Sequence, residues 1–341
     1  MVVDLRSDTV TKPTDEMRKA MYTAEVGDDV FGDDLTINKL EELAAETLGK
    51  QSAMFVPSGT MGNLLAIMTH TAPGQEIIIG KLAHIYRFEV AGYARLCGLG
   101  AKIVEETGGI LSPDDIEENI LKGSNIHQRS TGLICLENTH NFAGGIVSDA
   151  DMMKQARSVS KKYNVPIHLD GARLYNAATY LNTDIKNLTC DVDSVMLCLS
   201  KGLAAPVGSV LAGSKDFIRR ARHNRKMIGG GMRQAGILAA AGIIALTKMT
   251  DRLVQDHENA RMLAEGVEKL DGFDVDLENI QTNIVMVDIS VKDKDTSNIN
   301  DILKKDGILI SPLSPKRLRL TTNYHVEKKD VEYVLDKISK I

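Results

Sequence analysis

The chain reads Ser194-Val-Met-Leu-Cys-Leu-Ser-Lys201-Gly-Leu-Ala-Ala-Pro206-Val-Gly208 in the stretch that decides its fold. The apolar run from Val195 to Leu199 predicts a buried strand of a parallel sheet, because helices cover such strands on both faces. The strand carries Lys201 into a turn of small residues, and ligands bind just outside the carboxyl ends of parallel strands. Lys201 is therefore either a nucleophile that its surroundings keep neutral or an ordinary lysine of a solvated loop.

A second stretch upstream has the same form, Val165-Pro-Ile-His168-Leu-Asp170-Gly-Ala-Arg173. It predicts another buried strand, which ends in a carboxylate and a glycine turn. A buried aspartate near a buried lysine indicates a cofactor that needs both groups. Pyridoxal phosphate (PLP) is such a cofactor, since a lysine forms its Schiff base and an aspartate pairs with its protonated pyridine nitrogen.

Four motifs occur together and in order along the chain. They are Asp4-Leu-Arg-Ser7-Asp8-Thr9-Val-Thr11, Glu137-Asn-Thr-His140-Asn-Phe-Ala-Gly-Gly145, His168-Leu-Asp170-Gly-Ala-Arg173-Leu and Ser200-Lys201-Gly-Leu. With this combination the chain resembles the L-threonine aldolases of the low-specificity or L-allo type, over essentially its whole length. That family consists of fold-type I PLP enzymes and belongs to the β-eliminating lyase superfamily, with aspartate aminotransferase as a further relative.

The resemblance implies an α/β fold of the aspartate aminotransferase type. Its large domain is expected to hold a mostly parallel seven-stranded sheet, and a small α+β domain is expected at the C-terminus. The expected boundaries are an N-terminal arm over 1–14, a large PLP-binding domain over 15–250 and a small domain over 251–341.

Hydrophobic patterns place the individual elements of both domains. Strands of the large domain are predicted at 52–56, 76–79, 101–105, 133–136 and 195–199, with an antiparallel return strand at 207–212. Helices are predicted at 14–21, 35–48, 84–89, 112–123, 149–163, 215–226 and 237–246. In the small domain, helices near 253–270, 297–305 and 327–340 accompany strands near 273–277, 283–289, 308–311 and 316–322.

The resemblance further implies PLP-dependent retro-aldol cleavage of L-allo-threonine or L-threonine to glycine and acetaldehyde. The reaction is expected to pass through a Schiff base at Lys201 and a quinonoid carbanion, with Asp170 keeping the pyridine nitrogen protonated. Arg319 is expected to bind the substrate carboxylate, a bidentate task that suits a guanidinium group. Ser7 and Arg173 are expected to assist at the same carboxylate, and Arg173 also belongs to the expected cofactor site.

The group that removes the β-hydroxyl proton stays open between His84, His127 and a water held by the cofactor phosphate. By resemblance, His84 also stacks on the pyridine ring, and the histidine that matches His127 lies near the substrate hydroxyl. A lone histidine on a helix or in a loop is equally well a structural or solvated residue. The residues after both histidines, Arg87 in one case and Gln128-Arg129 in the other, depart from the usual family pattern.

The phosphate site is expected where a strand, a turn of small residues and a helix follow one another, at Ser58, Gly59 and Thr60. Backbone N–H groups and the positive end of the helix dipole attract anions there. An ordinary serine N-cap is the alternative interpretation. By resemblance, Lys226 and Arg233 reach the phosphate or a neighbouring chain, although a solvated basic face explains them equally.

Three other classes of protein compete with this interpretation. The nearest is another fold-type I activity on a small amino acid, either β-elimination or transamination, which the lysine, aspartate and arginine set does not exclude. A non-catalytic regulator with this fold is disfavoured by the intact Lys201. A nicotinamide-dependent enzyme lacks support, because no G-x-G-x-x-G follows a first strand.

The composition limits the partners of the protein. The 341 residues are 43% hydrophobic, which suffices for a large core, and a net charge of −5 argues against nucleic acid. No run has the length of a membrane span, and no signal-like block opens the chain. The four cysteines have no C-x-x-C spacing and predict free thiols in the cytoplasm, not a metal site.

The resemblance implies a homo-oligomer, a tetramer built from two dimers, with sites at the dimer interface. It implies a small amino-acid substrate. The preference between L-threonine and L-allo-threonine, the physiological substrate and the presence of a bound cation stay open.

Overall fold

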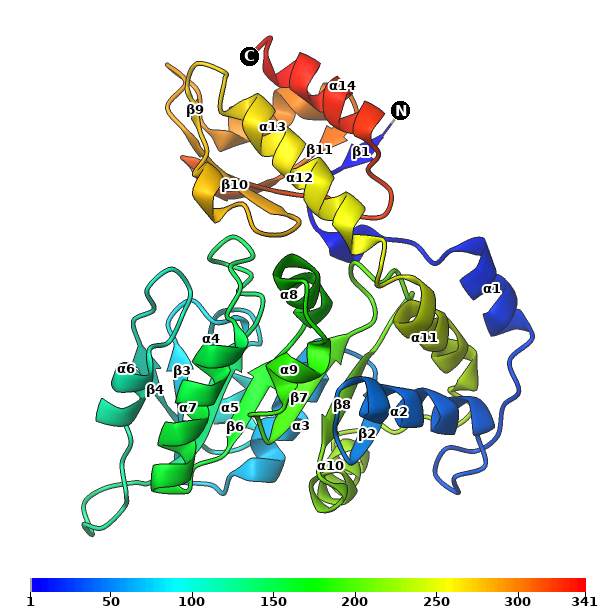
Figure 1. The fold of residues 1–341 in the computed structure, drawn as a ribbon, viewed down its shortest axis with the longest axis vertical. Helices are drawn as coiled ribbons and strands as arrows, with labels where there is room; N and C mark the ends of the chain where they lie inside the picture. The colour runs from blue at the N-terminus through cyan, green and yellow to red at the C-terminus, as the bar shows by residue number, and fades with distance from the viewer. Residues whose placement is uncertain (1) are drawn as a thin grey trace.

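The computed structural model describes residues 2–341. The chain forms a large part, in which helices cover both faces of a sheet, and a small part packed at one end of it (Figure 1). Residues 3–4 and 328–338 both lie in the small part, so the chain leaves it early and returns to it later (Figure 1).

A mixed sheet forms the centre of the large part. Among residues 2–341, its seven strands are ordered β2 (Ser52–Val56), β8 (Ser209–Gly213), β7 (Ser194–Cys198), β6 (Ile167–Asp170), β5 (Thr131–Glu137), β3 (Glu76–Gly80) and β4 (Gly100–Val104). β8 runs antiparallel to both of its neighbours, and the other pairs are parallel. The predicted mostly parallel sheet and its antiparallel return strand are confirmed.

Helices precede, connect and follow these strands. They are η1 (Asp8–Val10), α1 (Asp15–Tyr22), α2 (Leu35–Thr47), α3 (Gly59–His70), α4 (His84–Arg87), α5 (Gly92–Arg95), α6 (Pro113–Glu118), α7 (Ala150–Tyr163), α8 (Leu174–Leu181), α9 (Ile185–Thr189), α10 (Lys215–Met227) and α11 (Gly236–Lys248).

The strand that precedes the Lys201 turn shows why its sequence is continuously apolar. Side chains alternate between the two faces of a strand. Val195 and Leu197 of β7 belong to the core beneath α2, α7, α8 and α11, whereas Met196 and Cys198 belong to the core beneath α3 and α10. Because both faces are buried, the pattern of period two that marks a half-exposed strand is absent from β7.

The small part contains an antiparallel sheet and three helices. The sheet order is β12 (Ser311–Ser314), β13 (Arg317–Thr321), β10 (Ile284–Ile289) and β9 (Phe273–Asp274). The helices are α12 (Leu253–Val267), α13 (Thr296–Lys305) and α14 (Lys328–Ile338), with a short η2 (Leu277–Asn279). A separate core of this part contains Leu263, Val285 and Val334, so the small part has its own hydrophobic interior.

The N-terminal arm is integrated into the small part. β1 (Val3–Asp4) pairs in parallel with β11 (Ile308–Leu309), and Val3 and Leu5 lie in the core of the small part. The arm then crosses to the large part, where the Thr11 hydroxyl donates to the carbonyl oxygen of Lys201 at 2.8 Å. The arm therefore joins the small part to the lysine turn, and the domain boundaries at residues 14 and 250 stay predictions.

Two predicted helices are shorter than expected. The helix expected over 84–89 is the single turn α4, because Val90 and Ala91 have φ angles of 54° and 52°, and a right-handed helix cannot continue through such residues. The helix expected to end near Gly123 is α6, which ends at Glu118.

The strand expected at 273–277 is also shorter, because Asp276 caps the 3₁₀ helix η2 and ends the extended chain. Within residues 2–341, the helices are all too short or too polar to span a membrane.

Candidate active site

Lys201 lies half-buried at the carboxyl edge of the central sheet, in the turn from β7 to β8. Its carbonyl oxygen accepts hydrogen bonds from the Ala204 N–H at 2.9 Å and from the Thr11 hydroxyl. Gly208 closes the turn with a φ of 97°, and a Cβ there would lie 2.4 Å from the Phe55 ring. The turn thus needs glycine at this point, and its backbone contacts fix where the lysine side chain begins.

Two adjoining cavities meet at Lys201 and share Thr9, His84 and Lys201 as lining residues. The first, called here the cofactor cavity, has a volume of about 340 Å³ and is also lined by residues 57–60, Asn63, Glu89 and Asp170. The second, called the substrate cavity, has a volume of about 490 Å³ and is also lined by Ser7, Arg87, Asn141, Arg173 and Arg319. Nine of the predicted site residues line one or both of these cavities.

The N-terminus of α3 opens into the cofactor cavity. The Ser58 side chain caps this helix by accepting the Met61 N–H at 3.2 Å, which leaves the backbone N–H groups of Gly59 and Thr60 for a ligand. A Cβ on Gly59 would lie 2.9 Å from the Cys198 sulfur, so glycine lets the helix approach β7. Free N–H groups at the positive end of a twelve-residue helix suit a phosphate group.

Asp170 ends β6 and is buried at the other end of the same cavity. Its Oδ1 accepts the Ala172 N–H at 3.1 Å, and its Oδ2 accepts the Asn63 side-chain amide at 2.8 Å. A carboxylate held in this way is suited to pair with a cationic N–H group in the cavity.

Arg319 lines the substrate cavity and is held there by two hydrogen bonds. Its Nη1 donates to the Asn141 side chain at 3.0 Å, and its Nη2 donates to the Arg6 carbonyl at 3.2 Å. Its Nε is buried and has no hydrogen-bond partner within residues 2–341. Ser7 lines the same cavity. A guanidinium that lines this cavity suits a substrate carboxylate.

Arg173 has a different environment from the one expected. Its Nε and Nη2 each donate to Asp8 at 2.7 Å, and both side chains are nearly inaccessible to solvent. Only Nη1 extends toward Asn141, at 3.4 Å. Because Asp8 occupies the bidentate face of the guanidinium, Arg173 lines the substrate cavity without offering that face to a carboxylate.

Three predicted site residues lie outside both cavities of this chain. His127 is exposed in the loop before β5, and Arg129 of that loop pairs with Glu76 at the start of β3. The loop therefore lies at the amino ends of the strands, opposite the edge that carries Lys201. Lys226 and Arg233 are exposed, and Arg233 pairs with Asp28 at 2.9 Å.

Three residues that contact predicted site residues were not themselves predicted to belong to the site: Asp8, Asn63 and Glu89. Asp8 stands within a quoted motif, next to the expected Ser7. Asn63 is a fully buried polar residue on the apolar face of α3, and such a residue indicates a buried hydrogen-bond partner. Each of the three contacts a predicted site residue: Arg173, Asp170 and His84, respectively.

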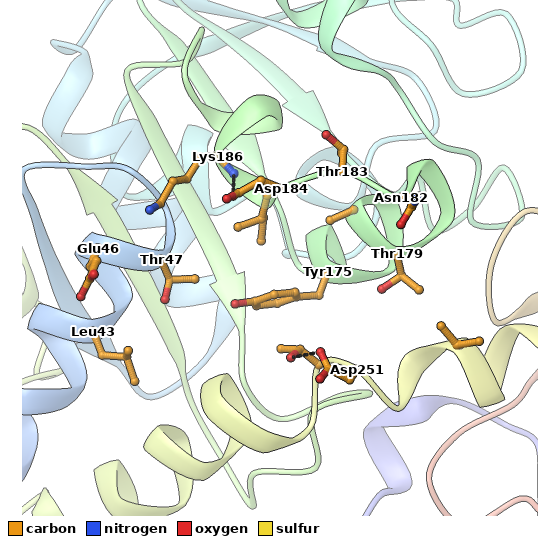
Figure 2. A pocket seen from close by; sticks show the side chains of 14 residues that line it. Leu43, Glu46, Thr47, Tyr175, Thr179, Asn182, Thr183, Asp184, Lys186 and Asp251 are labelled. Atoms are coloured by element: carbon orange, nitrogen blue, oxygen red, sulfur yellow. Dashed lines mark hydrogen bonds between the residues drawn. The ribbon is translucent and has the colours of Figure 1, made fainter.

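A larger cavity of about 710 Å³ lies apart from these two, between α2, α8 and the start of α12. Figure 2 shows Tyr175 and Asp251 facing it from one side and Glu46 and Thr47 from the other. Its lining contains none of the predicted site residues. Size alone therefore does not identify the active site of this chain.

Comparison with known proteins identifies the family. A family model described as beta-eliminating lyase matches residues 4–290. The chain belongs to the beta-eliminating lyase family. Low-specificity L-threonine aldolase 1 of Arabidopsis thaliana is 43% identical to this lyase over 338 residues, which is 98% of this chain and 94% of the relative. The low specificity L-threonine aldolase of Escherichia coli K12 is 41% identical over 335 residues, with 98% and 97% covered.

The fold of this lyase also matches a solved structure. The threonine aldolase of Leishmania major superimposes with a TM-score of 0.84 at 21% identity, covering 99% of each chain. The predicted resemblance to the threonine aldolases and the predicted fold class are therefore both confirmed.

Proposed function

We propose that this lyase cleaves L-allo-threonine or L-threonine to glycine and acetaldehyde with PLP as its cofactor. The full-length similarity to low-specificity L-threonine aldolases supports this activity. The observation that carries the proposal is the arrangement of the two cavities. Lys201, Asp170 and the N-terminus of α3 line one cavity, and Arg319 lines the cavity beside it.

The residues of the cofactor cavity fit PLP in chemical character. The N–H groups of Gly59 and Thr60 would hold the phosphate, Asp170 would pair with the pyridine nitrogen, and Lys201 would hold the aldehyde carbon. His84 lines both cavities and offers a flat ring at their junction. When bound, PLP supplies an electron sink that stabilises the carbanion left by breaking the Cα–Cβ bond.

The residues of the substrate cavity orient the amino acid. Arg319 and Ser7 hold its carboxylate, and the Asp8–Arg173 pair keeps the N-terminal arm at the wall of the cavity. Fixing the carboxylate would decide which bond at Cα is aligned for cleavage once PLP is bound, and alignment of this kind supplies a large part of the rate acceleration. This orientation selects cleavage of the Cα–Cβ bond.

Replacing Arg319 with lysine is expected to lower kcat/KM for L-allo-threonine about 100-fold, or about 2.7 kcal/mol, mainly through KM. Lysine keeps the charge but loses the Nε donor and the planar fork. Steady-state kinetics of acetaldehyde release measure the effect. The matched control is Arg317→Lys, because Arg317 lies two residues away on β13 and pairs with Asp288 at the surface. Equal KM values for wild type and Arg319→Lys would remove Arg319 from the carboxylate site.

The alternative is another fold-type I reaction, either β-elimination or transamination, on a small amino acid. Product identity separates the three. The experiment supplies purified, PLP-loaded protein with L-threonine, L-allo-threonine or L-serine, each with and without a 2-oxo acid as amino acceptor, and analyses the products by mass spectrometry. Glycine with acetaldehyde supports the aldolase, pyruvate with ammonia from L-serine supports elimination, and a new keto acid without ammonia supports transamination.

We further propose a cytoplasmic homotetramer, a dimer of dimers with sites at the dimer interface. Exposed apolar side chains gather on two segments that contact each other through Asp28–Arg233 and Asp29–Arg225. These side chains are Val26, Val30, Phe31, Leu35, Met227 and Ile237. The same segments carry the exposed Lys226 and Arg233, which supports the expectation that both reach a neighbouring chain.

The cytoplasmic assignment draws support from the cysteines. All four are free, and Cys97, Cys135 and Cys198 are buried, which suits a reducing compartment.

Light scattering after size-exclusion chromatography is expected to give four times the mass of one chain. Phe31→Glu is expected to lower this mass, because it places a charge in the apolar cluster. A wild-type protein that elutes as a monomer would refute the assembly.

A further inference from the structure

A buried carboxylate, Glu89, contacts the His84 ring at the cofactor cavity. The Glu89 side chain is only 5% exposed, and its Oε1 lies 2.9 Å from His84 Nδ1. One side-chain atom from each of His84, Glu89 and Asp170 lies within 4.8 Å of the others. The proposed reaction does not assign a role to Glu89, although Glu89 is buried beside His84, which lines both cavities.

The orientation of the Asn63 side-chain amide decides which groups donate and which accept hydrogen bonds at this site. Its side-chain nitrogen lies 2.8 Å from Glu89 Oε1 and 2.8 Å from Asp170 Oδ2. Two carboxylates need donors, so the NH₂ end of the amide must face them. The amide oxygen then faces the other way, toward His168 Nε2 at 3.0 Å.

A chain of buried groups behind Asn63 agrees with this direction. Burial lowers the pKa of His168 to about 4 and that of His70 to about 3, so both rings are neutral at pH 7. His168 therefore carries one proton, on the Nε2 that donates to Asn63, and its Nδ1 accepts the Ser194 hydroxyl at 2.9 Å. The Ser194 oxygen in turn accepts from His70 Nε2 at 2.8 Å. With Asn63 in this orientation, each bond in the chain has one donor and one acceptor.

This arrangement decides the protonation of the His84 ring. Glu89 Oε1 accepts from Asn63 and also contacts His84 Nδ1, so Nδ1 must carry a proton and donate it. The remaining nitrogen, Nε2, has no hydrogen-bond partner within residues 2–341, while the ring lines both cavities. In the neutral ring, Nε2 therefore presents a lone pair for a ligand.

We propose that Glu89 is a positioning residue that keeps the His84 proton on Nδ1 and so makes Nε2 the acceptor of the substrate's β-hydroxyl proton. The inference rests on the proposed aldolase function and deepens it by naming how the base is prepared. The hydroxyl proton moves to Nε2, and the O–H electron pair becomes the second bond of the aldehyde C=O. The Cα–Cβ electron pair stays with Cα, which then takes up one proton to give glycine.

Charged groups from several elements surround His84. Glu89 follows α4, Asp170 ends β6, Lys201 follows β7, and Glu137 of β5 accepts the His84 backbone N–H at 2.6 Å. Burial lowers the pKa of His84, but the hydrogen bond to Glu89 and the charges of Asp170 and Glu89 outweigh it and raise the pKa above its usual value. Lys201 opposes that rise.

The charges around His84 decide in which direction the pH dependence of kcat/KM is expected to move. Arg87 lines the substrate cavity with the same ring and adds a positive charge on that side. The base must be neutral to accept a proton, so kcat/KM falls as the pH drops through the pKa of His84. Removing the charge of Glu89 lowers that pKa, so the acid limb of the profile moves to lower pH.

The experiment compares PLP-loaded wild type with Glu89→Gln. Deuterium exchange at the imidazole C2 position reports the pKa of a single histidine, and the tryptic peptide from Leu82 to Arg87 contains only His84. The exchange midpoint is expected to fall by about one pH unit in Glu89→Gln. The acid limb of kcat/KM for L-allo-threonine is expected to move in the same direction, with a plateau about tenfold lower.

Two further variants separate positioning from general damage. Glu106→Gln removes a carboxylate from another buried histidine pair, His140 Nε2 to Glu106 Oε1 at 2.8 Å, and is expected to leave the His84 midpoint in place. Glu89→Asp keeps the charge and is expected to hold the His84 midpoint between those of wild type and Glu89→Gln. If circular dichroism shows that Glu89→Gln does not fold, the shift of the His84 exchange midpoint in Glu89→Asp tests the inference instead.

The results that would overturn the role of Glu89 differ from the result that would overturn the aldolase proposal. An unchanged His84 midpoint in folded variants of Glu89 would overturn the inference, and so would a midpoint that moves while the acid limb stays. If wild type releases no acetaldehyde, the proposed function fails. The exchange midpoint still shows in that case whether Glu89 controls the His84 proton.

Discussion

Replacing Lys201 with alanine is expected to lower acetaldehyde release about a thousandfold or more, or about 4 kcal/mol of the barrier. Lys201 is the lysine that lines both cavities, so no other amine of the site takes its place. Borohydride treatment of PLP-loaded wild type should attach the cofactor to the peptide that contains Lys201. In Lys201→Ala the same treatment should leave the corresponding peptide unmodified.

Lys215→Ala provides the matched control for this variant. Lys215 is an exposed lysine at the start of α10, away from both cavities. Its loss is expected to leave the rate of acetaldehyde release and the site of cofactor attachment unchanged. A Lys201→Ala protein that turns over at near-normal rate would contradict the assignment of both cavities.

Replacing Asp8 with asparagine is expected to lower the free energy of unfolding by about 3–5 kcal/mol. Asp8 is completely buried and holds the guanidinium of Arg173 through two hydrogen bonds of 2.7 Å, with Asn283 donating to it at 3.3 Å. Asparagine fits the space but leaves the charge of Arg173 buried and uncompensated. Urea unfolding followed by circular dichroism measures the change, and a higher KM is expected because the arm borders the substrate cavity.

The pH dependence of this contribution has a defined sign. Burial is the largest single influence and raises the pKa of Asp8, but the charge and hydrogen bonds of Arg173, the charge of Lys201 and the hydrogen bond from Asn283 together outweigh it and lower the pKa. A carboxyl group with a lowered pKa in the folded state stabilises the protein above its unfolded pKa of about 3.9, and this contribution is lost as the pH falls through the lowered pKa. In Asp8→Asn that acid-dependent contribution should be missing.

Asp4→Asn serves as the control in the same arm. Asp4 pairs with Arg6 at 2.6 Å on the surface, where such a pair contributes about 0–1 kcal/mol. Its loss is expected to change stability by no more than this amount. If Asp8→Asn were as stable as Asp4→Asn, the buried pair would not anchor the arm.

The strands and the carboxyl-edge residues were predictable from the sequence because they depend on local patterns. The apolar runs at β6 and β7 identify buried parallel strands, and adjacent parallel strands bring their carboxyl ends to one edge. Asp170 and Lys201 therefore had to lie near each other. Ser58 was predicted from the succession of strand, small-residue turn and helix and from the family resemblance, and it lies at the same edge because β2 runs parallel to β7 across β8.

Other features of the fold and the site could not be predicted, because they depend on side-chain directions and on contacts between residues far apart in the sequence. The pairing of β1 with β11 joins segments at opposite ends of the chain and involves only two residues in each strand. Glu89 lies just beyond the end of the single turn α4, and its contact with His84 depends on the direction of its side chain there. His127 was placed by resemblance alone, and its loop lies at the amino ends of the strands in this chain.

The central claim is that the protein is a PLP-dependent aldolase of β-hydroxy-α-amino acids. It is tested most directly by supplying purified, PLP-loaded protein with L-allo-threonine and L-threonine in separate reactions and quantifying acetaldehyde and glycine together. The account predicts equal amounts of both products from at least one of the two substrates, and the ratio of the rates gives the stereochemical preference. A protein that shows the absorbance of bound PLP but releases acetaldehyde from neither substrate would contradict it.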